Sequence, residues 1–180
     1  MSHRSAVASL PVFVYGTLMS RSVRKVLLGR EIVTQRAVLR GNFQRLKVVG
    51  QVFPALCPLE PNTTDTPTPI DGVLLLKLSQ DELSLLDDFE DSPLEYSREL
   101  LTVHRVEDSA SVSAFVYVRG KEATGSVSGV WNFEEFQNKH ERPFLNLCQR
   151  YIADYRKQQA RGVTQVTKDA GIVQRSFHTP

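Results

Sequence analysis

Apolar residues in the first two thirds of the chain fall in short runs that are typical of β-strands. The first run, residues 12–18, reads V-F-V-Y-G-T-L. Val, Phe and Tyr favour strands, and Gly16 permits backbone angles that a side chain forbids, so we predict a strand that ends in a sharp turn. Residues 19–28 have helical spacing, and a helix is expected to follow the turn.

Further runs with strand character occupy residues 32–39, 43–49, 52–56, 70–78, 100–106 and 114–118. The first two flank Gly41, which predicts a β-hairpin. Pro54 confines the third run to a sheet edge or a pocket wall, because proline has no N–H to donate. Residues 58–69 are rich in Pro, Thr, Asp and Asn and favour an exposed loop. Strands therefore dominate this part of the chain, without regular alternation with helices.

The segment S-Q-D-E-L-S-L-L-D-D-F-E, which begins at Ser79, predicts a helix. Ser79 and Glu82 stand in the S-x-x-E arrangement of a capping box, which marks a helix N-terminus. Leu83, Leu86 and Glu90 fall at i, i+3 and i+7, so they share one face of the helix. Glu90 is therefore expected to point in the same direction as the leucines.

Glu90 is the first candidate for chemistry. A carboxylate on an apolar face is costly unless it is paired or lies at the rim of a cavity. Burial raises its pKa toward neutrality, which suits a general acid and base. A salt bridge with Arg98 is the alternative, and the two are compatible because an arginine can position a catalytic carboxylate. Asp88 is expected on the opposite, solvent-facing side of the helix, and Asp87 at the boundary.

The turn after the first strand is the second candidate. Backbone N–H groups that stop pairing at such a turn point into one space and can bind an anion. The expected donors are Gly16, Thr17 and Leu18, and the N-terminus of the following helix would add partial positive charge. Taken alone, Y-G-T-L favours an ordinary buried strand followed by a glycine turn, since short motifs often match by chance.

Composition narrows the classes of protein that fit. The chain has 180 residues, 41% hydrophobic and 23% charged, as expected of one soluble globular domain. A net charge of +2 argues against a nucleic-acid binder. Cys57 and Cys148 match neither a zinc nor a disulfide spacing, and the histidines show no i, i+4 pair. We therefore expect a reaction that needs no metal and no cofactor.

The N-terminal apolar stretch contains Pro11 and runs directly into the glycine turn. It is too short and wrongly flanked for a signal peptide or a membrane span. We expect a cytosolic protein that has no membrane partner.

The last third of the chain is predicted to be helical. Asn132 and Glu135 fit a helix start, and Pro143 suits the first turn of a second helix. Four residues with helical spacing are expected in the core or in an interface: Phe144, Leu147, Tyr151 and Tyr155. The predicted division is an N-terminal extension at 1–10, a domain at 11–158 and a polar C-terminal tail at 159–180.

Three motifs, in this order, resemble those of the γ-glutamylcyclotransferase-like family, above all its plant avirulence-induced branch, which includes γ-glutamylamine cyclotransferases. They are V-Y-G-T-L at the first turn, L-D-D-F-E ending at Glu90, and Y-S-R from Tyr96 to Arg98. The later segments F-V-Y-V and W-N-F-E-E-F, with His140, resemble that family's late strand and the C-terminal helix of the plant branch. The similarity covers about residues 11–155, and the order of separate motifs makes it specific.

The resemblance implies an α+β fold: a small, mostly antiparallel β-barrel with helices packed outside. It also implies a reaction in which the α-amine of a γ-glutamyl compound attacks its own γ-carbonyl and releases 5-oxoproline. By this analogy Glu90 is the catalytic base and acid, and the amides of residues 16–18 hold the anionic glutamyl end. Further candidates for substrate contact are Tyr15, Pro54, Tyr96, Arg98 and Tyr117. The expected partner is a small γ-glutamyl substrate; its leaving group and the oligomeric state stay open.

One position departs from the family pattern. Asp91 stands where the family usually has glycine, and residues 92–95 are inserted before Tyr96. A second carboxylate beside Glu90 would raise its pKa further if both were partly buried. Asp91 thereby lends weight to a binding module that holds a carboxylate-bearing ligand without turnover. A third interpretation is a stress-responsive interaction protein that shares only the fold.

Overall fold

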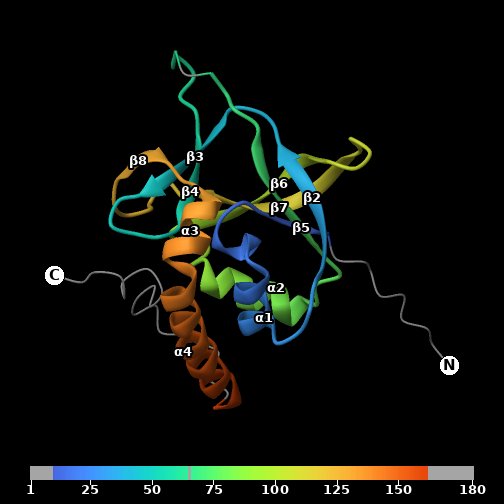
Figure 1. Cartoon of the computed structure of the whole chain (residues 1–180), viewed down its shortest axis with the longest axis vertical. Helices are drawn as coiled ribbons and strands as arrows, with labels where there is room; N and C mark the ends of the chain where they lie inside the picture. The colour runs from blue at the N-terminus through green and yellow to red at the C-terminus, as the bar shows by residue number, and fades with distance from the viewer. Residues whose placement is uncertain (1–9, 65, 162–180) are drawn as a thin grey trace.

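The computed structural model describes residues 10–64 and 66–161, and its centre is a closed barrel of five strands (Figure 1). Around the barrel the order is β1 (Val12–Val14), β5 (Ile70–Leu76), β2 (Val33–Leu39), β6 (Tyr96–Arg105) and β7 (Ser111–Arg119). The β1–β7 pair is parallel and the other pairs are antiparallel. The predicted α+β class and the mostly antiparallel barrel are confirmed.

A second sheet of three strands lies beside the barrel (Figure 1). Its order is β4 (Pro54–Pro58), β3 (Phe43–Val48) and β8 (Val127–Val130). Pro54 opens an edge strand, as predicted, and the loop that follows β4 is mostly exposed. Strand β8 was not predicted, because its V-S-G-V sequence is short and largely exposed.

The predicted hairpin between β2 and β3 is wrong. Strand β2 already pairs with β5 on one side and β6 on the other, so neither of its edges is open to β3. At Gly41 the backbone takes φ +129°, a conformation that favours glycine, and the chain leaves the barrel there. Strand β3 pairs with β4 and β8 in the second sheet instead.

The helices pack outside the barrel (Figure 1). They are a 3₁₀ turn η1 (Thr17–Met19), α1 (Arg21–Leu28), α2 (Gln80–Phe89), α3 (Phe133–Lys139) and α4 (Glu141–Ala160). The capping box of α2 is present, with Ser79 and Glu82 each accepting the other's backbone N–H. Asn132 caps α3, and Pro143 lies in the first turn of α4, both as predicted.

Successive side chains of a strand point to opposite faces, and this alternation divides the core into two clusters. Phe13, Leu74 and Val116 belong to the cluster on the inner face of the barrel strands. Val12 and Val14 point the other way and join a second cluster with the helices, which contribute Leu27, Leu86, Phe136, Phe144 and Cys148. Both clusters run along β1, so packing fixes the end of this strand firmly.

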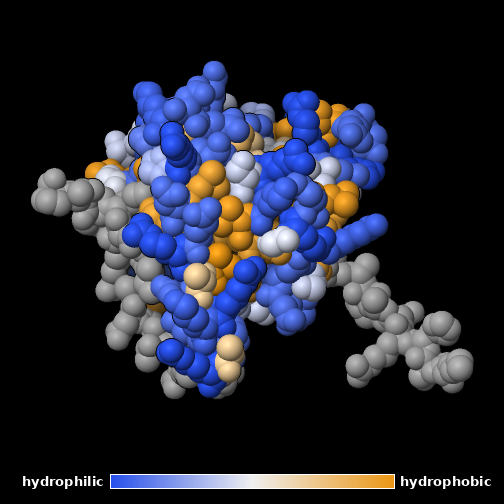
Figure 2. All heavy atoms as spheres, turned by 60° about the horizontal axis from the view of Figure 1, so that its bottom comes forward, coloured by the Kyte–Doolittle hydropathy of each residue, from blue (hydrophilic) through white to orange (hydrophobic). Residues whose placement is uncertain are grey.

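The helical side of the molecule carries apolar side chains at its centre, bordered by hydrophilic residues (Figure 2). Among the described residues, no helix combines the length and the apolar character that a membrane crossing requires. The predicted N-terminal extension and most of the predicted C-terminal tail lie outside the described residues, while α4 continues to Ala160.

Candidate active site

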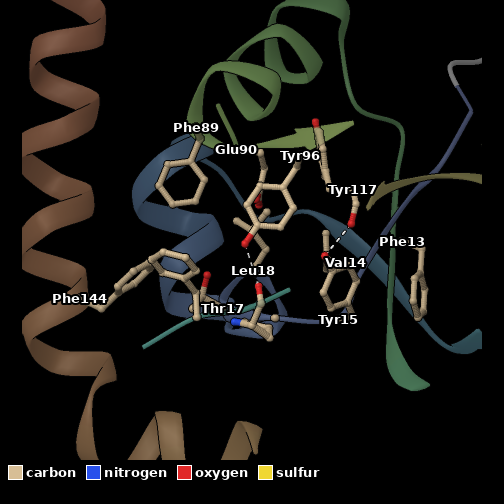
Figure 3. A pocket seen from close by; sticks show the side chains of 13 residues that line it. Phe13, Val14, Tyr15, Thr17, Leu18, Phe89, Glu90, Tyr96, Tyr117 and Phe144 are labelled. Carbon is tan, nitrogen blue, oxygen red and sulfur yellow. Dashed lines mark hydrogen bonds between the residues drawn. The ribbon is translucent and has the colours of Figure 1, made fainter. Parts of the chain in front are cut away.

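One pocket brings together most of the predicted site residues (Figure 3). It is lined by the predicted residues Tyr15, Gly16, Thr17, Leu18, Pro54, Glu90, Tyr96 and Tyr117. In the close-up, Glu90 comes from the end of α2 and faces the Thr17–Leu18 turn, with Phe89 and Phe144 on one side and Tyr15 and Tyr117 on the other. A strand end and a helix end more than 70 residues apart in sequence therefore meet across one space.

The turn forms because β1 stops at Val14 and a 3₁₀ helix begins at Thr17. A side chain at Gly16 would place Cβ 2.9 Å from Cγ and Cδ of Pro54, so the two segments approach closely only with glycine there. The Met19 and Ser20 amides donate to the carbonyls of Gly16 and Thr17, whereas the first N–H groups of a helix have no intrahelical acceptor. This geometry agrees with the predicted anion-binding role of residues 16–18, which stays a prediction.

Glu90 is the C-terminal cap of α2, and its N–H donates to the Leu86 carbonyl at 2.9 Å. Burial raises the pKa of its carboxyl from 4.5 to about 8, and the negative charge of Asp87 adds to the rise. The residue is half-buried and lines the pocket, so its carboxyl can reach a ligand bound there. A carboxyl with such a pKa carries its proton at neutral pH and can still exchange it.

The ion pair in this region forms with Asp87, one helical turn before Glu90. Arg98 Nη1 lies 2.5 Å from one oxygen of Asp87, and the Tyr117 hydroxyl donates to the other at 2.7 Å. Arg98 is not among the residues that line the described pocket. The partnership with Glu90 that the sequence suggested for Arg98 is therefore replaced by one with Asp87, which itself affects Glu90 through its charge.

The hydroxyls of Tyr15 and Tyr96 form hydrogen bonds that connect segments of the pocket wall. Tyr15 donates to the Tyr117 carbonyl at 2.5 Å and accepts from the Leu56 N–H at 3.3 Å. Tyr96 donates to the Pro54 carbonyl at 3.0 Å. Burial is the main cause that raises the pKa of all three tyrosines, so each hydroxyl is neutral. These bonds give the tyrosines a structural role, and their contact with substrate stays a prediction.

Asp91 occupies a backbone position that explains the family's usual glycine. Its φ is +49°, its N–H donates to the Asp88 carbonyl, and the Ser92 N–H donates to the Asp87 carbonyl. This pair of bonds is the Schellman motif that ends many helices, and its left-handed residue is most often glycine. Aspartate tolerates this conformation better than most residues. The carboxylate that raises the pKa of Glu90 is Asp87, whereas Asp91 is not among the causes.

Asp88 was expected to face solvent, but it is half-buried and accepts a hydrogen bond from the Tyr151 hydroxyl of α4 at 2.6 Å. Five further residues line the pocket that the sequence did not single out as site residues: Phe13, Val14, Phe53, Phe89 and Phe144. Phe144 was predicted only as a core or interface residue. The helical spacing of Phe144 and the apolar residues after it predicted an apolar face of α4. Nothing in the sequence indicates that this face packs against Glu90.

Within the described ranges, no three His, Cys, Asp or Glu side chains gather in a way that could hold a metal ion. Cys57 is half-buried and Cys148 is buried, and both are free thiols. The pocket therefore offers one ionisable carboxyl, a turn of backbone amides and an aromatic wall.

Comparisons with known proteins agree with this architecture. A family model described as gamma-glutamyl cyclotransferase, AIG2-like matches residues 12–133. AIG2-like protein D of Arabidopsis thaliana is 34% identical over 144 residues, which cover 79% of this chain and 89% of that protein. AIG2-like protein C of the same plant is 31% identical over 157 residues, covering 87% and 86%.

A comparison with solved structures finds a similar fold in a plant protein. A solution structure of an Arabidopsis thaliana protein superposes with a TM-score of 0.57 at 27% identity, covering 92% of this chain and 99% of the other. The family match spans both the turn at Gly16 and the helix end at Glu90. The chain belongs to the gamma-glutamyl cyclotransferase, AIG2-like family.

Proposed function

We propose that the protein is a γ-glutamyl cyclotransferase, which converts a γ-glutamyl amino acid or amine into 5-oxoproline and the free amine. One observation carries this proposal: a carboxyl with a pKa of about 8 faces a turn of backbone amides across a pocket, in a chain of this family. Acid–base catalysts work best when their pKa lies near the working pH.

In the proposed first step Glu90 acts as a base. Its carboxylate takes a proton from the substrate's α-ammonium, and the free amine attacks the γ-carbonyl carbon of the same molecule. The approach of the ammonium favours the ionised carboxylate, because an opposite charge lowers a carboxyl pKa. The new C–N bond closes a five-membered ring and places negative charge on the former carbonyl oxygen.

In the second step Glu90 acts as an acid. It gives that proton to the leaving nitrogen, and the original C–N bond breaks as the carbonyl forms again. The ring nitrogen passes its second proton to the carboxylate, and the released amine takes that proton up. Glu90 ends the cycle as the carboxylate with which it began. One carboxyl therefore suffices, and no covalent intermediate is needed. Because attack is intramolecular, holding the folded conformer supplies a large part of the acceleration.

The turn at residues 16–18 is proposed to hold the substrate while Glu90 transfers the protons. The amides of residues 16–18 are proposed to bind the glutamyl carboxylate, and oriented N–H groups can do so without reorganising. Phe89 and Phe144 border the pocket next to Glu90, and their rings limit the access of water to the carboxyl. The cytosolic location expected from the sequence stays a prediction.

The test is a panel of γ-glutamyl dipeptides and γ-glutamyl amines, with 5-oxoproline release as the readout. We expect release by the wild type and a rate at least about a thousandfold lower for Glu90→Gln, the upper range for a lost acid–base group. Glu99→Gln is the matched control, because Glu99 is an exposed residue of β6. Activity that survives in Glu90→Gln contradicts the mechanism.

The same panel separates catalysis from binding alone. If no compound yields 5-oxoproline while several raise the midpoint of thermal unfolding, the pocket binds γ-glutamyl compounds without turning them over. That result would favour the non-catalytic binding module over the cyclotransferase.

A further inference from the structure

Arg24 is a buried cation directly behind the turn. It lies on α1, is 8% exposed, and its Nη1 donates to the carbonyls of Leu18 at 2.8 Å and Met19 at 2.7 Å. The acidic group that acts on it is Glu31, which is already paired with Arg21 and Lys25. Within residues 10–64 and 66–161, this guanidinium therefore bonds to carbonyl oxygens and pairs with no carboxylate.

An arrangement of this kind is costly. A buried charge loses its hydration, and a partner of opposite charge normally offsets part of the loss. A neutral side-chain amide could donate to the same carbonyl oxygens without that cost. The hydrogen bonds alone therefore do not account for a full positive charge at this place.

Arg45 holds the other end of the turn. Its Nη1 donates to the Tyr15 carbonyl at 3.0 Å, and because the peptide is planar and trans, this fixes the direction of the Gly16 N–H. Arg45 also pairs with Asp71 at 2.8 Å and lies over the Trp131 ring. Asp71 thus neutralises the charge of Arg45, whereas no carboxylate of the described part of the chain pairs with Arg24.

We propose that Arg24 is a positioning residue of the pocket. Its guanidinium fixes the carbonyls of Leu18 and Met19 and leaves the turn with a net positive charge, for which the carboxylate of the ligand is the counter-ion. This inference rests on the proposed function and deepens it, because it assigns recognition of the glutamyl carboxylate to a charge that does not touch the ligand.

The experiment compares two ligands that differ by one charge. They are 5-oxoproline, which has a carboxylate, and 5-oxoprolinamide, which has a neutral amide there. Calorimetric titration of the full chain at neutral pH and low salt should show that the wild type prefers the anion by roughly tenfold or more, the scale of a charge-assisted hydrogen-bond network.

Three variants separate charge from structure. In Arg24→Gln the preference for the anion should disappear, while affinity for the neutral amide changes less than about threefold. Arg24→Lys keeps the charge and should keep a several-fold preference. Arg21→Gln is the matched control: it removes the same charge from the same helix, at a side chain that is 75% exposed and bonded to Glu31, and should behave as the wild type.

The outcomes against the proposal are distinct. A wild type that shows no preference for the anion overturns it, and so does an Arg24→Gln variant that weakens both ligands equally, because that is what a purely structural role produces. If Arg24→Gln does not fold, Arg24→Lys decides: a folded variant that has lost the preference overturns the proposal.

Turnover gives a second readout. With an active γ-glutamyl substrate, Arg24→Gln should raise KM roughly tenfold and change kcat less than about threefold, the pattern of binding energy lost equally from the ground state and the transition state. A wild-type KM in Arg24→Gln overturns this inference and leaves the cyclotransferase standing. If no substrate yields 5-oxoproline but the binding preference still depends on Arg24, the proposed reaction fails and the role of Arg24 remains.

Discussion

The two sides of the pocket differ in the ionisable groups that stand behind them. On the turn side, the guanidinium groups of Arg24 and Arg45 hold carbonyls of residues 15–19. On the helix side, Glu90 ends α2 with Asp87 one turn before it. The C-terminus of a helix also carries partial negative charge, which works in the same direction as Asp87.

This difference indicates what kind of ligand fits. The end of a γ-glutamyl unit carries an ammonium and a carboxylate on one carbon, and in the proposed reaction the carboxyl of Glu90 receives a proton from the ammonium while the turn binds the carboxylate. The two sides also use different means. The turn acts through backbone groups that cannot change protonation, whereas the helix end presents a carboxyl whose pKa of about 8 lets it gain and lose a proton.

After the loss of Glu90 itself, damage to the turn side should have the largest effect on the rate. In Gly16→Ala the new Cβ meets Pro54 at 2.9 Å, so the turn must shift and its amides lose their direction. We expect 5-oxoproline release to fall by about a hundredfold or more, as for lost oxyanion donors or a misplacement of about 1 Å.

The double variant Gly16→Ala with Pro54→Ala serves as the control, because it removes the two ring atoms that clash. It should recover part of the lost rate in a double-mutant cycle. Full activity in Gly16→Ala alone would show that the turn does not need its present geometry.

Replacing Glu90 by a residue that cannot ionise should change how the stability of the fold depends on pH. Between pH 4.5 and about 8 the folded protein keeps the Glu90 proton that the unfolded chain has released, so this group lowers stability as pH rises. Glu90→Gln cannot ionise, and it should stabilise the protein by a few kcal/mol at pH 8 to 9 but by little near pH 4.5, at about 1.4 kcal/mol per pKa unit.

Thermal unfolding at both pH values measures this difference, with Glu99→Gln as the exposed control. An equal shift in the two buffers would mean that Glu90 has an ordinary pKa in the folded protein.

Asp87→Asn removes a negative charge that raises the pKa of Glu90 and leaves Glu90 itself unchanged. Burial remains the larger cause of the raised pKa, so the midpoint of the pH–rate curve should move below 8 but stay above 4.5. Asp88→Asn removes the same charge one residue later, where the carboxylate faces Tyr151, and should leave the midpoint in place. Equal shifts in both variants would contradict the specific role of Asp87.

Asp91→Gly should have the smallest effect. Glycine suits the left-handed position at φ +49°, so stability should rise by up to about 1 kcal/mol in denaturant unfolding. Activity should stay within about twofold, because Asp91 is not among the causes of the raised pKa of Glu90. A large gain in activity would instead support the interpretation that Asp91 disables the site.

Local signals in the sequence predicted much of this arrangement. The strand with its glycine turn, the capping box at Ser79 and the helical face that carries Glu90 depend on neighbours within a few residues, and all three are present. The hairpin at Gly41 failed because pairing is decided by which strand edges remain open, and closure of the barrel uses both edges of β2.

The partners across the pocket depend on packing that no local pattern encodes. Arg98 is near Glu90 in sequence, yet β6 brings its guanidinium to Asp87. Phe144 reaches the pocket only because α4 packs beside α1 and α2. Arg24 reaches the carbonyls of Leu18 and Met19, behind the turn, only because α1 directs one face toward them. Proximity in sequence therefore did not predict which charged side chains form an ion pair.

Exchange of the Glu90 proton near neutral pH is the central feature of the proposed site. Carboxyl ¹³C NMR titration of the free protein measures this directly, with the resonance assigned by its absence in Glu90→Gln. A midpoint near pH 8 is the predicted result. A midpoint near the ordinary value of 4.5 would show that the site does not hold the Glu90 proton near neutral pH and would contradict this claim.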